Sequence, residues 1–172
     1  MKIIIPVNRM NRVAIHCFGI LGIFVVSILI RLPALVNAEH LLSGDEAFMA
    51  VAILELMNGS PMFFNYEGVT YHGVLGGLTA IPFMKTLGVG PLAYALPATL
   101  YYSLYVWSTY LLAKVIVPRM AFLVVILMIV PTPAVLSITL NNYPHTEIAF
   151  LGNIIFLLFI YIKINDRKSV WG

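Results

Sequence analysis

Two adjacent carboxylates, Asp45 and Glu46, are the residues of this sequence whose type and placement best suit chemistry. They follow a long apolar stretch in a chain of which only 10% of the residues are charged, against about 25% in an ordinary soluble protein. An ionised carboxylate within hydrogen-bonding reach of a hydroxyl can act as a general base. Acidic side chains also favour the first turn of a helix, because the helix macrodipole stabilises them there. The sequence leaves both interpretations open.

Other ionisable residues have equally simple structural explanations. Glu147 follows Pro144 at a predicted helix start, where an acid is favoured by the macrodipole. His72 and Lys85 lie close to predicted membrane boundaries, where polar side chains serve as interface anchors. His16 lies about one turn inside a predicted span, so it is either functional or able to reach the interface.

The composition predicts a membrane protein, since 61% of the residues are hydrophobic. Apolar runs of about 18 residues or more are typical of transmembrane helices. We therefore predict that residues 1–172 form a single all-α polytopic membrane domain with about four transmembrane helices. The predicted spans are Val13 to Ile30, Pro91 to Ala113, Ala121 to Leu140 and Thr146 to Ile162. Within the last span, Gly152 and Asn153 are interpreted as helix-packing residues.

The composition also has alternative interpretations. The first span could be a secretory signal cleaved after Val36-Asn37-Ala38, but its apolar run is longer than the roughly 7–15 residues of a signal core, which favours a retained anchor. The net charge of +3 does not indicate a nucleic-acid partner, because the basic residues cluster at the ends of spans. The single cysteine, Cys17, excludes a disulfide within the chain and a cysteine metal site.

Charge bias decides whether the shorter apolar run Gly73 to Leu87 crosses the membrane. Cytoplasmic loops carry the excess of Lys and Arg. If this run does not cross, only Arg31 and Lys85 of the ten Lys and Arg residues lie outside; if it crosses, most of the ten do. We therefore predict a cytoplasmic N-terminus, four spans, and a Gly73–Leu87 segment along the outer membrane surface. All acidic residues except Asp166 then lie outside.

The outer loop, residues 31–90, has its own predicted structure. Ser43 and Glu46 fit a capping box, which starts a helix by binding its free N–H groups. Gly59 is a plausible C-terminal stop, so a helix is expected from about Gly44 to Asn58. Apolar residues surround this helix almost completely, which favours packing beneath other protein or burial in the membrane interface. An aromatic loop punctuated by glycine follows.

The order of these features resembles the GT-C superfamily of membrane glycosyltransferases, and most closely its protein-mannosyltransferase and aminoarabinose-transferase group. The resemblance covers nearly the whole chain, but only the N-terminal part of the family's fold of roughly a dozen spans. The chain is accordingly expected to be a fragment or a split product. The elements that carry the resemblance are Arg31-Leu32-Pro33, Asp45-Glu46-Ala47-Phe48, Asn58-Gly59, the Tyr66/Gly68/Tyr71/Gly73 spacing, Leu87-Gly88 and Glu147.

The resemblance implies transfer of a sugar from a polyprenyl-phosphate donor to an acceptor on the outer face of a prokaryotic plasma or inner membrane, with inversion. It implies Asp45 as the general base, with Glu46 supporting it. Glu147 would be the second acid, orienting the acceptor or helping to hold a divalent metal, which is left open. Lys85, His72 and Arg31 are the candidates for binding the donor phosphate, and Tyr66 and Tyr71 belong to the substrate loop.

The sequence departs from the family's pattern in two places. The second acid is a glutamate where many relatives have an aspartate, and Tyr71-His72-Gly73 replaces a His-Pro-Pro type of loop. The main alternative is a non-catalytic membrane subunit or lipid-carrier-binding scaffold, and a complementary C-terminal polypeptide would be a partner. A transporter half is disfavoured because no inverted repeat is visible and no charged residue lies deep within a span.

Overall fold

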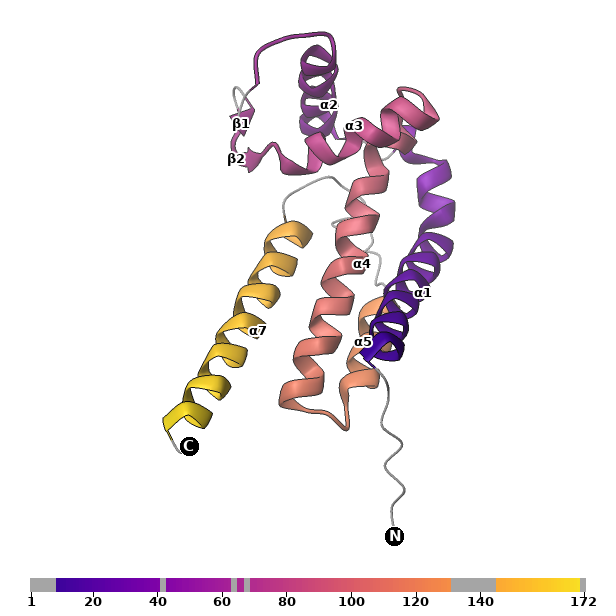
Figure 1. Cartoon of the computed structure of the whole chain (residues 1–172). Coiled ribbons are helices and arrows are strands. Elements are labelled where there is room, and N and C mark those ends of the chain that lie inside the picture. The colour runs from indigo at the N-terminus through magenta and orange to yellow at the C-terminus, as the bar shows by residue number, and fades with distance from the viewer. Residues whose placement is uncertain (1–8, 41–42, 63–64, 67–68, 131–144, 171–172) are drawn as a thin grey trace.

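The chain folds into a bundle of long helices with a smaller cap at one end (Figure 1). A computed structural model describes residues 9–40, 43–62, 65–66, 69–130 and 145–170. For Arg9–Cys17, the two strands and the last seven residues of the final helix it describes the backbone only. The described residues are helical apart from one two-stranded hairpin, in agreement with the predicted all-α class.

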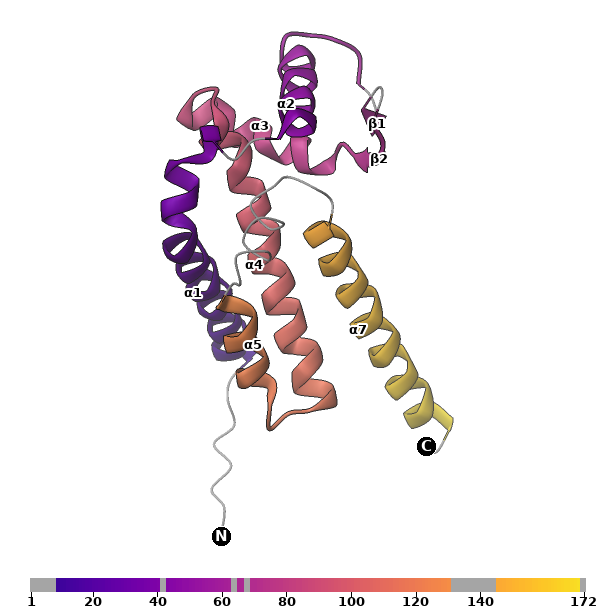
Figure 2. The same cartoon turned by 180° about the vertical axis from the view of Figure 1, so that it is seen from behind.

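Four helices form the bundle. They are α1 (Arg9–Val36), α4 (Pro91–Ile116), α5 (Ala121–Ile129) and α7 (His145–Val170). Helices α1 and α5 run toward the cap, whereas α4 and α7 run away from it, so α1 begins and α7 ends at the same end of the bundle (Figure 1). Helix α4 is central, because α1, α3, α5 and α7 all pack against it. Seen from behind, α5 lies between α1 and α4 (Figure 2).

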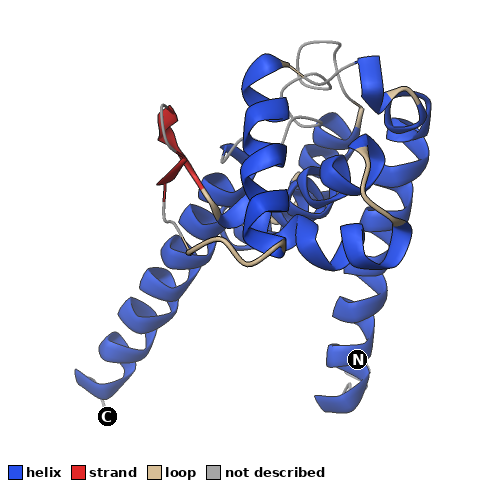
Figure 3. Ribbon diagram, turned by 90° about the horizontal axis from the view of Figure 1, so that it is seen from above, coloured by secondary structure: helices blue, strands red, loops and turns tan. Residues whose placement is uncertain are grey.

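The cap consists of the segments between α1 and α4. These are the 3₁₀ turn η1 (Ala38–His40), α2 (Gly44–Met57), strands β1 (Asn65–Tyr66) and β2 (Val69–Gly73), and α3 (Leu75–Leu87). The strands are antiparallel, with Asn65 opposite Gly73 and Tyr66 opposite Val69. The hairpin lies at the edge of the cap beside α2 (Figure 3). The sequence predicted an aromatic loop in this region, and the structure has two paired strands, β1 and β2, instead.

The predicted helix boundaries are close to the observed ones at most ends. Helix α2 ends at Met57 rather than Asn58, and Gly59 adopts a φ of 101°, the left-handed conformation expected after a helix. The exception is α1, which continues through Arg31 and Pro33 to Val36. The segment from residue 31 therefore begins as a helix of the bundle rather than as a loop.

One helical stretch among the described residues, His145–Lys163, is long and apolar enough to cross a membrane by length and composition. Leu21–Val36 is apolar but shorter. Helix α4 is rich in Tyr, Ser, Thr and Pro, which lowers its hydropathy, and α5 is described over nine residues only. The structure thus provides one candidate span, and the number of four remains a prediction.

The outer surface of the bundle is nevertheless apolar. Exposed large hydrophobic side chains occur on all four of its helices: they include Phe18, Leu21, Val25 and Leu29 of α1; Leu92, Val115 and Ile116 of α4; Phe122, Leu123 and Leu127 of α5; and Ile148, Leu151, Ile155, Phe156 and Phe159 of α7. Exposed apolar side chains in such number are typical of a surface that contacts lipid or protein.

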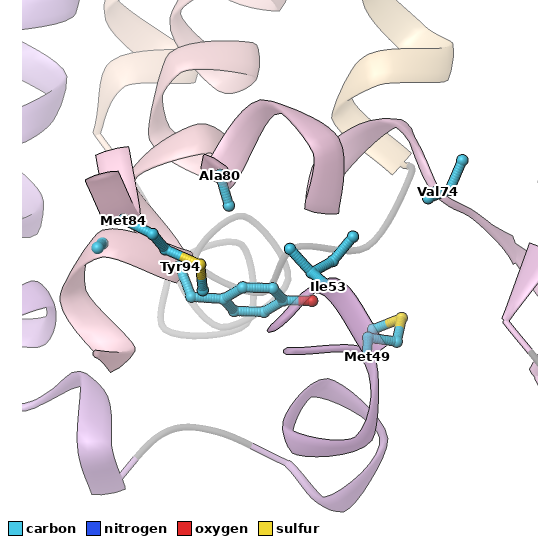
Figure 4. Close-up of a cluster of buried hydrophobic side chains, with 7 residues drawn as sticks. Met49, Ile53, Val74, Ala80, Met84 and Tyr94 are labelled. Atoms are coloured by element: carbon cyan, nitrogen blue, oxygen red, sulfur yellow. The ribbon is translucent and has the colours of Figure 1, made fainter. Parts of the chain in front are cut away.

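A cluster of buried side chains fastens the cap to the bundle (Figure 4). Met49 and Ile53 come from α2, Ala80 and Met84 from α3, and Tyr94 from the first turn of α4. The small buried residues Gly76, Gly77 and Ala80 let α3 lie close to its neighbours. One side of α2 packs in this cluster, whereas Phe48 and Val51 on its other side are about half exposed, so burial of that side in the membrane interface remains a prediction.

Candidate functional site

The predicted capping box is present at the start of α2. The Glu46 amide donates to the Ser43 hydroxyl at 3.3 Å, and the Ser43 amide donates to Glu46 Oε2 at 3.1 Å. Glu46 is only 1% exposed. Its carboxylate is therefore engaged in starting the helix, which is a structural role.

Asp45 differs from its neighbour because its side chain is exposed. Successive helical residues point about 100° apart, so Glu46 faces the buried side while Asp45 faces outward. The chain leaves α2 at the end far from the bundle, in the arc at the top of Figure 2, so the first turn of α2 lies toward the bundle. The Asp45 carboxylate is therefore accessible in the first turn of α2, near the junction of the cap and the bundle.

Glu147, the predicted second acid, is buried at the start of α7, with 2% of its surface exposed. Thr146 donates to its Oε2 across 3.4 Å. Glu147 therefore lies at the cap end of α7, which packs against α4, with the Thr146 hydroxyl close by.

Arg31 lies inside the bundle, although it was expected on the surface as a phosphate ligand. It is fully buried between α1 and α4, and its guanidinium carbon lies 3.8 Å from the centroid of the Tyr102 ring. Its Nη1 donates to the Ser27 carbonyl at 3.5 Å. A role in phosphate binding would require α1 and α4 to separate, and it remains a prediction.

The other predicted ligands belong to the cap. Lys85 is exposed in the last turn of α3. His72 and Tyr71 lie in β2 and Tyr66 lies in β1, but their side chains are outside the described part of the structure. Asp45, Lys85 and Glu147 therefore all lie on elements at the cap end of the molecule, whereas Arg31 belongs to the helix interface.

A metal site was left open by the sequence. Within the described part of the chain, no three His, Cys, Asp or Glu side chains come together in a way that could hold a metal ion. The donor sets of the usual sites need several such ligands. The described residues therefore provide no metal centre around Asp45 or Glu147.

Several buried polar residues were missed from the sequence. Ser27, Thr99, Tyr102 and Ser103 are all at most 2% exposed, and all lie between helices. The sequence spacing gives part of this information. Ser27 and Arg31 are four residues apart, as are Thr99 and Ser103, and residues at this spacing lie on the same face of a helix. Their partners on the other helix could not be identified without the fold.

The interpretation of Asn153 as a packing residue is confirmed. Its side-chain amide donates to Thr109 at 2.8 Å and to Ser108 at 3.1 Å, which ties α7 to α4. Gly152 does not have this role, since a Cβ placed there would meet nothing within 4 Å.

No protein-family model, curated protein or solved structure matches this chain.

Proposed function

We propose that this chain is, or is part of, a polytopic membrane glycosyltransferase that moves a sugar from a polyprenyl-phosphate donor to an acceptor at the outer face of the membrane. Asp45 acts as the general base. The observation that carries the proposal is the contrast at the start of α2, where Glu46 is buried in the capping box and Asp45 is exposed beside it.

The chemistry needs few groups. The Asp45 carboxylate takes the proton of the acceptor hydroxyl as that oxygen attacks the anomeric carbon. The bond between the anomeric carbon and the phosphate oxygen breaks, and its electron pair stays with the polyprenyl phosphate. A cation near that oxygen stabilises the developing charge, and exposed Lys85 is the available candidate. The attack from the face opposite the phosphate inverts the anomeric centre.

The apolar outer surface of the bundle supports a four-helix membrane domain, and the Lys and Arg bias favours the cap on the outer side. In this arrangement the Asp45 end of α2 lies near the boundary where a lipid-linked phosphate is found. Membrane lipid and the donor are then the partners, and the plasma or inner membrane is the location.

The test compares Asp45→Asn with Glu46→Gln in the intact enzyme in native membranes. The readout is release of polyprenyl phosphate from a panel of labelled polyprenyl-phosphate sugars. Loss of a general base should lower the rate by about 10²–10⁴ fold, so Asp45→Asn should be nearly inactive. Glu46→Gln can keep the capping box and should stay active. Full activity of Asp45→Asn would rule out the base.

A second candidate is a non-catalytic subunit that binds lipid carriers, and the burial of Arg31 and Glu147 favours it, because two of the predicted site residues serve helix packing. This candidate predicts binding of polyprenyl phosphate to the purified full chain without any sugar release. It also predicts equal binding by wild type and Asp45→Asn.

A further inference from the structure

The turn between α4 and α5 combines two cations with exposed apolar side chains. It lies at the end of the bundle away from the cap (Figure 1). Lys114 and Arg119 are both exposed. Large apolar side chains beside them are exposed as well, with 42–71% of their surface accessible: Val115, Ile116, Val117, Met120 and Phe122. Such a surface is apolar enough to contact lipid or protein, yet its charges are too costly to place in the hydrocarbon layer itself.

The backbone of this turn is hydrogen-bonded where it leaves α4. The Val117 amide donates to the Ala113 carbonyl at 2.8 Å, and the Met120 amide donates to the Val117 carbonyl at 2.9 Å. The second bond closes a four-residue turn, and α5 begins at the next residue. The positions of Lys114 and Arg119 are therefore set by the hydrogen-bonded turn.

The charges of the two cations are not neutralised within the described part of the chain. The Lys114 ammonium lies 5.8 Å from the centroid of the Tyr110 ring, which is a cation–π contact with a neutral side chain. The described acidic side chains lie in the cap or at the cap end of α7: Glu39, Asp45, Glu46, Glu55 and Glu147. Both positive charges therefore remain available to an anion from outside the chain.

We propose that the α4–α5 turn binds an acidic phospholipid, with Lys114 and Arg119 at the headgroup and the exposed apolar side chains of the turn against the acyl chains. Charge complementarity requires a net negative headgroup, and the apolar side chains require hydrocarbon beside it. An acidic phospholipid provides both in one molecule. A free phosphate ion leaves the apolar side chains in water, and a zwitterionic lipid leaves the positive charge without compensation.

The lipid site rests on the proposed membrane domain and does not depend on sugar transfer. Basic residues next to a membrane span are attracted to anionic lipid, and the cytoplasmic leaflet carries such lipid. The Lys and Arg bias favours this end of the bundle on the cytoplasmic side. A bound acidic lipid would then hold the turn at the level of the headgroups.

Quenching by brominated lipid tests the site in the full chain reconstituted into vesicles. Met120→Trp places a fluorophore in the turn, while Trp107→Phe and Trp171→Phe remove the native ones. The vesicles contain equal amounts of phosphatidylglycerol and phosphatidylcholine, and one lipid or the other carries the bromine. Brominated phosphatidylglycerol should quench more strongly, because its relative affinity for the turn should rise by about fivefold for each cation.

Charge variants show which residues cause the preference. Lys114→Gln and Arg119→Gln should each lower it by about fivefold, and the double variant should abolish it. Substitutions at exposed positions such as these usually leave the fold intact. Lys163→Gln is the matched control, because it removes an exposed cation of α7 outside the turn, so the preference should persist. Salt at about 1 M should weaken the preference, since it shortens the Debye length to about 3 Å.

Four results would overturn the lipid site. They are equal quenching by the two brominated lipids, an unchanged preference in the double variant, an equal loss in Lys163→Gln, and loss of the preference when inorganic phosphate is added at constant ionic strength. The last result would identify a site for free phosphate. Absence of quenching by either lipid would overturn the proposed membrane domain together with the site, so the two failures can be distinguished.

Discussion

The guanidinium of Arg31 covers the ring of Tyr102 at 3.8 Å, while the Tyr102 hydroxyl donates to the Met128 carbonyl at the end of α5. One tyrosine therefore joins three helices, with the cation from α1 on its face and α5 at its tip. A desolvated cation over an aromatic face contributes about 2 kcal/mol or more. This contact gives α1, α4 and α5 a common fixed point.

The Arg31–Tyr102 pair should respond asymmetrically to substitution. Arg31→Met removes the buried charge and keeps most of the side-chain volume, so it should cost less than about 1.5 kcal/mol. Tyr102→Leu leaves the buried cation without its ring and should cost about 3–5 kcal/mol. The measurement is the unfolding equilibrium of the full chain in mixed micelles.

Tyr102→Phe is the control for this prediction, because it keeps the ring under Arg31 and removes only the bond to Met128. It should cost about 1 kcal/mol. If Arg31→Met proves more costly than Tyr102→Leu, the cation–ring contact is not what stabilises this junction.

The capping box predicts a graded response at the start of α2. Ser43→Ala removes the side-chain acceptor for the Glu46 amide and should cost about 1 kcal/mol. Glu46→Ala should cost more, because it also leaves a gap where a buried side chain was. Glu46→Gln should be the mildest, since glutamine can complete a capping box.

Hydrogen exchange provides the site-resolved measurement for α2. Amides of the first turn should exchange faster in Ser43→Ala, while those near Ile53 should be unchanged. The amides near Ile53 are the internal reference, and equally faster exchange there in Ser43→Ala would contradict an effect confined to the first turn.

The Asn153 amide predicts a measurable coupling between α7 and α4. Asn153→Ala removes both interhelical hydrogen bonds and should cost about 0.6–1.7 kcal/mol, the range found for such bonds in membrane proteins. In double-mutant cycles, the coupling to Thr109→Val should exceed that to Ser108→Ala. The reason is that Thr109 is the nearer acceptor and Ser108 is already bonded to the Tyr105 carbonyl. Zero coupling in both cycles would argue against this contact.

The orientation in the membrane can be read by cysteine labelling. In a Cys17→Ser background, Lys85→Cys should react with an impermeant maleimide added to intact cells, because the excess of Lys and Arg at the other end of the bundle predicts that the cap lies outside. Lys114→Cys, at the end of α4 away from the cap, should react only after permeabilisation. The reverse pattern would invert the topology.

Local signals in the sequence were sufficient for the elements around the candidate site. The capping box at Ser43 and the stop at Gly59 involve residues a few positions apart, so the start and end of α2 could be predicted closely. The same holds for α7, which begins one residue from the predicted position. These signals depend on backbone groups within one or two turns.

The environment of Arg31 could not be predicted in this way. Its partner Tyr102 is far away in the sequence, and Arg31-Leu32-Pro33 has the composition of a helix end. The helix continues past Pro33, and Leu35 in its last turn packs with Ala95 of α4 in a buried cluster. Long-range packing therefore places Arg31, one of the three phosphate-binding candidates, in the interior rather than on the surface, and it also buries Glu147.

The burial of Tyr94 between the cap and the bundle links the position of α2 to the tilt of α4. Tyr94 lies in the first turn of α4 and shares its cluster with Met49 and Ile53, so α2 is mounted directly on the central helix (Figure 4). Membrane helices tilt when the thickness of the hydrocarbon layer does not match their length. A tilt of α4 would move α2 with it. The distance between the Asp45 carboxylate and the lipid would then depend on the thickness of the bilayer.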